Sequence, residues 1–288
     1  MLISADESGY AVGDPLSPRR LLLVGTDAGT LELLQREDRQ IRCVQESSQA
    51  LAYVREAPCD LVVASHGSDP SAGLRLVRRL RAIRPETRVI LTGDGDPTML
   101  VAAIRARVYG YFHEPVSRSA LADMVQLALD STSWRDDIRV TSADLSWVEF
   151  DVRCKMEAAE RATQFAREIL SCLPAKACED ASAAFRELLF NAVEHGGHLD
   201  PRKRARVSLV HGRHALVGQI QDPGKGFSLG RLPHAAISNP DDSPTRHVEI
   251  REQVGQRPGG FGILISRSLV DELAYNERGN AAMFVKYL

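Results

Sequence analysis

Five short apolar runs recur in the first half of the chain and alternate with segments of helical apolar spacing. The runs are LLLVG (21–25), IRCVQ (41–45), LVVAS (61–65), RVILT (88–92) and GYF (110–112). Between them, apolar residues three or four positions apart indicate helices, as in Leu74, Val77 and Leu80. Strands that alternate with helices predict a parallel sheet covered on both faces. We therefore expect an α/β, doubly wound, five-stranded domain over residues 19–130, closed by a helix at about 117–130.

The second half of the chain has a different order of elements. The pattern predicts a strand (145–153), two helices (about 156–172 and 178–195), two strands (206–212 and 214–222), a helix (about 261–271) and two strands (272–277 and 281–288). This order indicates an α+β domain over 144–288, with a largely antiparallel sheet and helices on one face. Two polar segments lie outside both domains: 1–18 is expected to be a flexible tail and 131–143 a linker.

Composition excludes several classes of protein. The chain has 36 basic and 38 acidic residues and a formal charge of −2, which argues against a dedicated nucleic-acid binder. No apolar run approaches the ~20 residues that span a bilayer, and the N-terminus lacks the pattern of a secretory signal. Five cysteines without a CxxC pair are typical of a reducing compartment. We expect a cytoplasmic protein with no direct nucleic-acid or membrane contact.

The first domain resembles the receiver domains of response regulators. The resemblance covers about residues 19–130 and rests on element order and on LLLVGTDAGTLELLQ, CDLVVASHGSDPSAGLRLVRRLR, VILTG and GYFHEPV. Receivers that are phosphorylated have an acidic pair after the first strand and an acceptor Asp after the third. They also have a Thr or Ser after the fourth strand and a Lys before a Pro after the fifth.

Three of these parts are missing from this chain. Gly25 and Thr26 stand at the acidic pair with Asp27 one position later, Ser65 stands at the acceptor, Thr92 is retained, and Glu114 stands where the Lys would be. Ser65 has no evident base beside it, because the adjacent His66 should point to the other side of the strand. Magnesium binding needs carboxylates, and phosphoryl transfer needs a nucleophile and a balancing cation. We therefore expect a pseudo-receiver that is not phosphorylated and serves for partner contact or homodimerisation.

The second half contains a polar helix segment, AAFRELLFNAVEHGG (183–197). Its helical spacing places Glu187, Asn191 and His195 four residues apart on one face. A carboxylate and an amide on one face can supply a general base and a neutral oxygen ligand for Mg²⁺. Surface helices also carry such pairs routinely, so this segment alone is weak evidence.

Two glycine-containing segments follow it. In DPGKGF, Asp222 ends an apolar strand, and Gly224 and Gly226 allow close backbone approach to a ligand. In RPGGFGILISRSLVDEL, a loop with Gly260 and Gly262 runs into an amphipathic helix whose N-terminus can bind phosphates. Separately, these segments would also fit a plain turn and a glycine hinge.

Together, and in this order, the three segments match the N, G1 and G2 boxes of the Bergerat-type ATP-binding fold. Histidine kinases, gyrase-like ATPases and anti-sigma-factor kinases share this GHKL fold. The resemblance covers about 144–288 and implies an α+β Bergerat-type ATP-binding sandwich. The segments ELLFNAVEHG and SLVDELAYNERGNAAMFVKYL are similar to those of the anti-sigma-factor serine kinases of partner-switching systems.

This resemblance implies roles for individual residues. Glu187 would be the catalytic base, Asn191 the Mg²⁺ ligand and Asp222 the adenine anchor. Residues 228–258 would form a lid over ATP. The remaining residues implied at the nucleotide site are His195, Gly224, Gly226, Gly260 and Gly262.

The resemblance also implies a function. The expected protein is an ATP- and Mg²⁺-dependent serine/threonine kinase that phosphorylates a STAS-type anti-sigma antagonist. In its other state it would hold a sigma factor, and a PP2C-type phosphatase would be a further partner. A histidine kinase is disfavoured, because the 131–143 segment between the domains contains no His. Two alternatives stay open: a nucleotide-dependent protein-binding module without kinase activity, and an ATPase whose output is unrelated to sigma factors.

Overall fold

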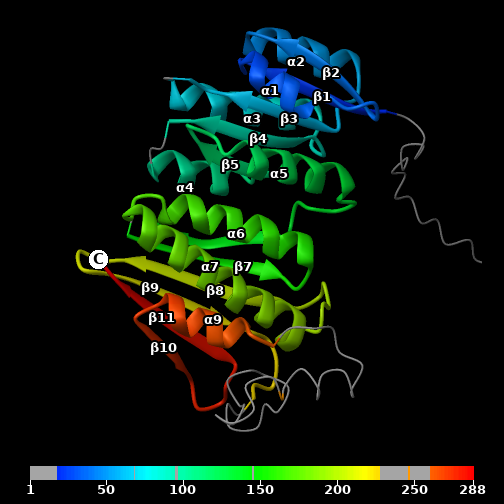
Figure 1. Cartoon of the computed structure of the whole chain (residues 1–288). Coiled ribbons are helices and arrows are strands. Elements are labelled where there is room, and N and C mark those ends of the chain that lie inside the picture. The colour runs from blue at the N-terminus through cyan, green and yellow to red at the C-terminus, as the bar shows by residue number, and fades with distance from the viewer. Residues whose placement is uncertain (1–17, 68, 95–96, 145, 228–245, 247–259) are drawn as a thin grey trace, which may run out of the picture.

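The computed structural model describes residues 18–67, 69–94, 97–144, 146–227, 246 and 260–288. The first part is a parallel sheet in the order β2-β1-β3-β4-β5 (Figure 1). Its strands are β1 (Arg19–Val24), β2 (Arg39–Val44), β3 (Leu61–Ser65), β4 (Arg88–Gly93) and β5 (Gly110–His113). Its helices are α1 (Ala28–Leu34), α2 (Ser47–Glu56), α3 (Pro70–Ile83), α4 (Pro97–Arg105) and α5 (Arg118–Asp130). The predicted doubly wound, five-stranded α/β architecture is confirmed.

Strands β1, β3 and β4 of the first sheet are buried on both faces because they are apolar at consecutive positions, whereas edge strand β2 has no buried position. In β1, Leu22 and Val24 face the cluster formed with α2, α3 and α4, while Leu21 and Leu23 face the cluster formed with α1 and α5. Side chains alternate along a strand, so an unbroken apolar run fills both layers. This arrangement brings the carboxyl ends of all five strands to one edge of the sheet.

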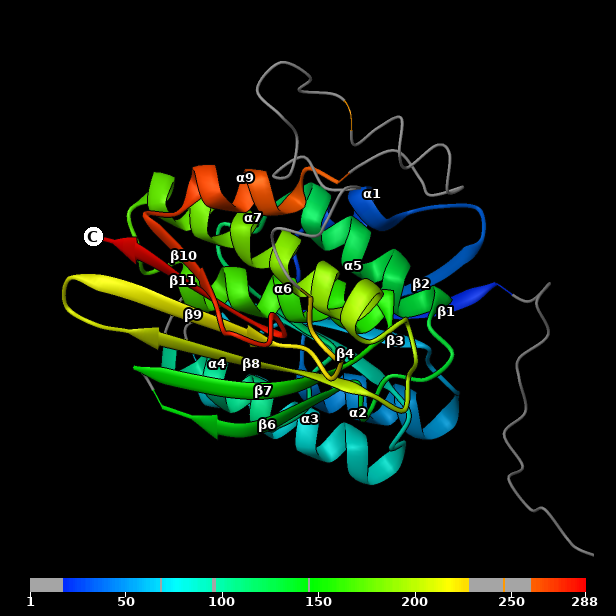
Figure 2. The ribbon, with the colours of Figure 1, turned by 90° about the horizontal axis from the view of Figure 1, so that it is seen from below.

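The second part is an antiparallel sheet in the order β10-β11-β9-β8-β7-β6. Its strands are β6 (Ile138–Ala143), β7 (Trp147–Arg153), β8 (Arg204–His211), β9 (Ala215–Gln221), β10 (Glu272–Tyr275) and β11 (Ala281–Tyr287). Its helices are α6 (Met156–Leu170), α7 (Ala175–Asn191), the π-helical turn η1 (Ala192–Gly196) and α9 (Gly262–Leu269). Figure 2 shows α6, α7 and α9 on one face of this sheet, as the sequence predicts. None of the helices in the described ranges is both long and apolar enough to cross a membrane.

The structure differs from the sequence prediction in the segment expected to be a linker. Residues 138–143 form β6, the edge strand of the second sheet, which pairs antiparallel with β7. Only its two ends, Ile138 and Ala143, are buried, so the strand shows too few apolar positions for a strand prediction. Trp134, which precedes it, is also buried and packs edge-on against Tyr109 with ring centroids 5.8 Å apart.

Helix α6 joins the two parts of the molecule. It packs against β5 and α4 on one side and against β7 and α7 on the other (Figure 1). The side chain of Arg161 on α6 is 3% exposed and donates to the carbonyls of Tyr109 and Trp134, each at 3.0 Å. Its guanidinium also lies 4.2 Å from the Tyr109 ring centre and 3.6 Å from a carboxylate oxygen of Asp137. A buried, multiply bonded cation therefore fixes the first sheet on α6.

A second polar contact crosses the same interface near the carboxyl end of β5. The ring Nδ1 of His113 lies 2.5 Å from Glu168 Oε2 on α6, and the His113 backbone N–H donates to the same oxygen at 3.1 Å. Burial raises the pKa of Glu168, and the hydrogen bonds from His113 oppose that rise. The end of β5 is thus tied directly to a helix of the second part.

Candidate functional site

Helix α9 begins against the polar face of α7. A Cβ placed on Gly262 would lie 2.8 Å from Glu187 Oε2 and 3.2 Å from Asn191 Nδ2. The first turn of α9 thus lies directly against these two side chains, and glycine at 262 leaves them in place. The structure brings Glu187, Asn191 and Gly262 together, at a helix N-terminus whose dipole favours negative charge.

The polar helix does not continue as an α-helix to His195. Helix α7 ends at Asn191, and η1 is a π-helical turn in which the Gly197 N–H donates to the Ala192 carbonyl at 2.8 Å. The contacts of Gly262 involve Glu187 and Asn191. That His195 shares their face stays a prediction. His195 is exposed in this turn.

The end of η1 contacts Asp222, the residue that follows β9. The side chain of Asp222 would collide with a Cβ on Gly196, so the glycine permits this approach. Asp222 is partly buried, and its Oδ1 accepts a hydrogen bond from the Gly224 N–H at 2.7 Å. Burial is the main cause of a raised Asp222 pKa, and the hydrogen bond from Gly224 opposes it. A partly desolvated carboxylate with one fixed hydrogen bond is well suited to accept from a ligand amino group.

The four predicted loop glycines have different surroundings. A Cβ on Gly224 would meet both Asp222 Oδ1 at 2.7 Å and the Gly196 carbonyl at 2.9 Å. Gly226 has φ +82° and packs against the backbone at Arg278, in the turn between β10 and β11. Gly260 has φ +94° and lies two residues before Gly262, the first residue of α9. That these four glycines line the nucleotide stays a prediction. The predicted lid, 228–258, falls outside the described residues except for 246.

Sequence reasoning missed the role of Asn280. Its carbonyl accepts from the Asp222 N–H at 2.9 Å, and its Nδ2 donates to the Asp222 carbonyl at 3.4 Å. Asn276 holds Asn280 in place, because its Oδ1 accepts from the Asn280 N–H at 3.0 Å. The sequence indicates only a turn at 278–280, and a pairing across 58 residues has no local signal.

The site fits a magnesium-bound nucleoside triphosphate. Asp222 offers a hydrogen-bond acceptor for an exocyclic amino group, and the start of α9 offers a positive helix end to phosphates. Asn191 would hold Mg²⁺ through its amide oxygen, and Glu187 lies beside it. When bound, the metal would neutralise phosphate charge while keeping phosphate and water oxygens as its other ligands. Within the described ranges, no group of three or more His, Cys, Asp or Glu side chains could hold a metal ion.

Asp222→Asn is expected to weaken ATP binding about tenfold or more, because an amide cannot replace a charged acceptor at a buried hydrogen bond. In the wild type, ATP affinity should fall as the pH falls. The fall should begin at a higher pH than it would for an aspartate with the ordinary pKa of 3.8. The sign follows from the raised pKa: the acceptor form of Asp222 is lost on protonation. Calorimetric titration of both proteins from neutral to mildly acidic pH tests this. A wild-type affinity that is flat with pH and matches that of the variant would contradict it.

The first part of the chain has its own cavity, of about 720 Å³, at the carboxyl edge of the parallel sheet. All the positions that depart from the phosphorylated pattern line it, together with Thr92: Gly25, Thr26, Asp27, Ser65 and Glu114. Ser65 Oγ donates to Glu114 Oε1 at 3.1 Å, and Thr92 Oγ1 donates to the same oxygen at 3.3 Å. The prediction that Ser65 lacks a neighbouring base was wrong, because Glu114 comes from a strand end 49 residues away. His66 does point to the other side, where it is buried against Gly93 and Tyr111.

Small phosphodonors are expected to leave the first part of the chain unmodified. An incoming phosphoryl group at Ser65 would meet the Glu114 carboxylate at the position where phosphorylated receivers have a cation. Mass spectrometry of the full chain after treatment with acetyl phosphate and Mg²⁺ measures this directly. A species heavier by roughly 80 Da, mapped to Ser65, would contradict the expectation.

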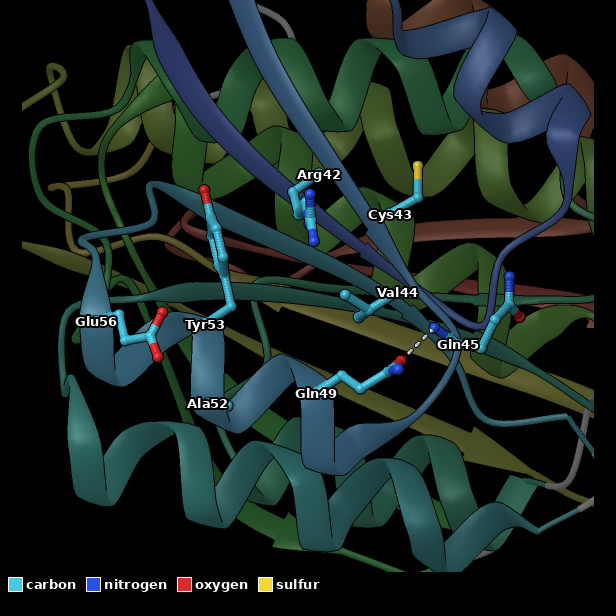
Figure 3. Close-up of a pocket in the computed structure, with 8 residues that line it drawn as sticks. All are labelled: Arg42, Cys43, Val44, Gln45, Gln49, Ala52, Tyr53 and Glu56. Atoms are coloured by element: carbon cyan, nitrogen blue, oxygen red, sulfur yellow. Dashed lines mark hydrogen bonds between the residues drawn. The ribbon is translucent and has the colours of Figure 1, made fainter.

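A second cavity, of about 450 Å³, lies between β2 and α2. Figure 3 shows its lining, in which the Gln49 amide oxygen accepts from the Gln45 N–H at 3.1 Å. Strands β2 and β5 are the two edge strands of the first sheet, and α6 packs against β5. The cavity therefore lies at the edge of the sheet away from α6. It contains none of the residues that the sequence indicated as functional. Its lining residues are Arg42, Cys43, Val44, Gln45, Gln49, Ala52, Tyr53 and Glu56.

Comparisons with known proteins agree with this two-part description. Residues 152–286 match the histidine kinase-like ATPase domain family, and residues 27–126 match the response regulator receiver domain family. Transcriptional regulatory protein GlrR of Escherichia coli K12 and transcriptional regulatory protein QseF of Escherichia coli O157:H7 are each 28% identical to this chain over 132 residues. The alignment covers 42% of this chain and 30% of each relative, so the chain spans under a third of their length.

Solved structures of receiver proteins are also similar to part of the chain. One from Methanospirillum hungatei JF-1 is 21% identical, with a TM-score of 0.36, over 40% of this chain and 95% of its own. A response regulator from Thermotoga maritima is 20% identical, with a TM-score of 0.36, over 40% of this chain and 100% of its own. On the two family matches, the chain joins a response regulator receiver domain to a histidine kinase-like ATPase domain.

Proposed function

We propose that this chain is an ATP-dependent serine/threonine protein kinase of a bacterial partner-switching system. The observation that carries the proposal is the convergence of three separate segments on one site. Gly262 of α9 abuts Glu187 and Asn191 on α7, and Gly196 of the following π-turn abuts Asp222. One end of this site suits phosphates and the other an adenine amino group.

Transfer to a hydroxyl needs a base within hydrogen-bond reach of the acceptor. Glu187 is one-third exposed and lies beside Asn191, which places its carboxylate where it could accept such a proton. The proposed acceptor is a Ser or Thr of a STAS-type anti-sigma antagonist, with a sigma factor as the alternative partner and a PP2C-type phosphatase reversing the reaction. The similarity of the helix and the C-terminal strands to anti-sigma-factor kinases supports this choice of partners.

In this proposal the receiver domain regulates the kinase without being phosphorylated itself. Glu114 takes the place of the balancing cation, and Ser65 replaces the acceptor Asp. The contact with the ATPase domain runs through α6, which packs on β5 and also on α7, the helix that bears Glu187. A partner that moves β5 would therefore act through α6 on α7, which bears Glu187 and Asn191.

One observation favours the second candidate, a nucleotide-dependent binding module without kinase activity. Arg186 Nη1 lies 3.8 Å from Glu187 Oε1, and the same guanidinium donates to Glu160 at 3.0 Å. A base that takes a proton from an incoming hydroxyl would have to share its carboxylate with this cation. The two candidates differ in whether phosphate is transferred, not in whether ATP is bound.

The experiment for the proposed function is an affinity capture with the full chain, carried out with ATP, with ADP and without nucleotide. We expect a STAS-domain protein to be recovered in amounts that depend on which nucleotide is present. The Asn191→Ala variant, which lacks the proposed metal ligand, should lose that dependence. Recovery of no STAS-domain protein under any of the three conditions would contradict the proposed partner class.

A further inference from the structure

The cavity of the receiver domain lies between α1 and α5 at the carboxyl ends of the strands. Its volume of about 720 Å³ is in the range of small-molecule sites, which are usually apolar with a few placed polar groups. The apolar wall of this cavity consists of Leu33, Pro115, Val116 and Leu121. The lining also presents the Ser65 and Thr92 hydroxyls and the carboxylate of Glu114.

The lining of this cavity has more acidic than basic side chains, whereas a phosphate-binding site is positively charged. Glu114 accepts from two hydroxyls on a single oxygen, Oε1, and no cation bonds it within the described part of the chain. Asp27 caps α1, accepting from the N–H and the hydroxyl of Thr30 at 2.7 and 2.6 Å. Arg118, the cation among the described lining residues, donates to the Gly29 carbonyl at 3.2 Å and keeps its charge. The described lining therefore has two carboxylates and one guanidinium, an excess of negative charge that favours a cation over an anion.

A cation with N–H donors complements these groups. An ammonium has three donors and no acceptor, and Glu114 has an oxygen, Oε2, that accepts nothing from the described residues. The Ser65 and Thr92 hydroxyls donate their protons to Glu114, and their oxygens keep lone pairs that can accept from the same ammonium. The carbon skeleton of such a ligand would lie on the apolar wall. An exposed ion pair alone is weak, so that wall is needed for affinity.

We propose that this cavity binds a small organic cation, a primary ammonium on a short aliphatic chain, with Glu114 as its anchor. The binding site is independent of the kinase activity proposed above. Its position gives it a route to the rest of the molecule, because Glu114 directly follows His113, which bonds Glu168 of α6.

The test uses the full chain and butylammonium chloride, with sodium butyrate as a probe of the same length and opposite charge. Saturation-transfer NMR at constant ionic strength follows each probe during titration. We expect saturable binding of butylammonium and none of butyrate. Glu114→Gln should weaken butylammonium binding about two- to fivefold, as for an exposed ion pair, and Ser65→Ala, which removes one hydroxyl that orients Glu114, should weaken it less.

The matched control is Glu56→Gln, which removes a carboxylate from the lining of the β2–α2 cavity shown in Figure 3. This variant should bind butylammonium as the wild type does. Equal binding of butyrate, an equal loss in the Glu56 and Glu114 variants, or no saturable binding of butylammonium would each overturn the proposal. Because Ser65→Ala is conservative, it keeps the proposal testable if Glu114→Gln does not fold: unchanged affinity in Ser65→Ala would then count against it.

Discussion

Glu187→Gln is expected to lower phosphoryl transfer to the protein substrate by about 10²–10⁴-fold while leaving ATP affinity nearly unchanged. The amide keeps the size of the side chain and its contact with Gly262, but it cannot accept the proton of the acceptor hydroxyl. In the proposed site, Asp222, Asn191 and the start of α9 would bind ATP instead. Calorimetry for ATP and a labelled-phosphate assay for transfer separate the two effects.

Glu194→Gln is the matched control for this experiment. Glu194 is an exposed carboxylate in the π-turn that follows α7, about two turns away from Glu187, so its variant should transfer phosphate at the wild-type rate. If Glu187→Gln loses ATP binding together with transfer, the residue has a structural role. If both glutamine variants transfer normally, Glu187 is not the base.

Arg161→Ala is expected to lower the free energy of unfolding by about 3–5 kcal/mol. The substitution leaves the Tyr109 and Trp134 carbonyls without their buried donor and removes the ring contact with Tyr109. Asp137 keeps its ion pair with Lys155 at 3.2 Å, so the loss falls mainly on the interface between the two domains. Stabilities of whole domains are about 5–15 kcal/mol, so this change is a large fraction of the total.

Urea unfolding followed by circular dichroism measures this loss, with Arg167→Ala as the control. Arg167 lies on the same helix but is exposed, so its removal should cost within about 0.5 kcal/mol. A loss below about 1 kcal/mol for Arg161→Ala would show that the interface does not depend on this residue. A change in the slope of the transition would indicate that the two domains no longer unfold together.

The sequence predicted those features of the fold that have a local signal. The apolar run Leu21–Val24 is buried on both faces, and that is visible as an unbroken run. Edge strand β6 buries only its two end positions, and most of its other residues are polar. Its sequence therefore resembles that of a linker. The π-turn at 192–196 ends the α-helix that was expected to run to 195, and no local spacing pattern indicates an added residue in a turn.

The residues of the candidate site also divide into those with a local sequence signal and those without one. Glu187 and Asn191 could be paired from their four-residue spacing, and the structure keeps them together. The contact of Gly196 with Asp222 and the bond between Ser65 and Glu114 join residues that are distant in sequence. Their pairing depends on how strand ends meet at a sheet edge and on how helices pack, which requires the assembled fold. Arg161 was missed for the same reason, because a charged residue on a helix is normally expected to be exposed.

Transfer of the ATP γ-phosphate is the measurement that tests the account most directly. Full-length protein is incubated with γ-labelled ATP, Mg²⁺ and the STAS-domain protein that it captures. The account predicts label on a Ser or Thr of that protein, retained with Glu194→Gln and lost with Glu187→Gln. A captured STAS-domain protein that binds in a nucleotide-dependent manner but acquires no label from the wild-type chain would contradict the kinase and leave a binding module.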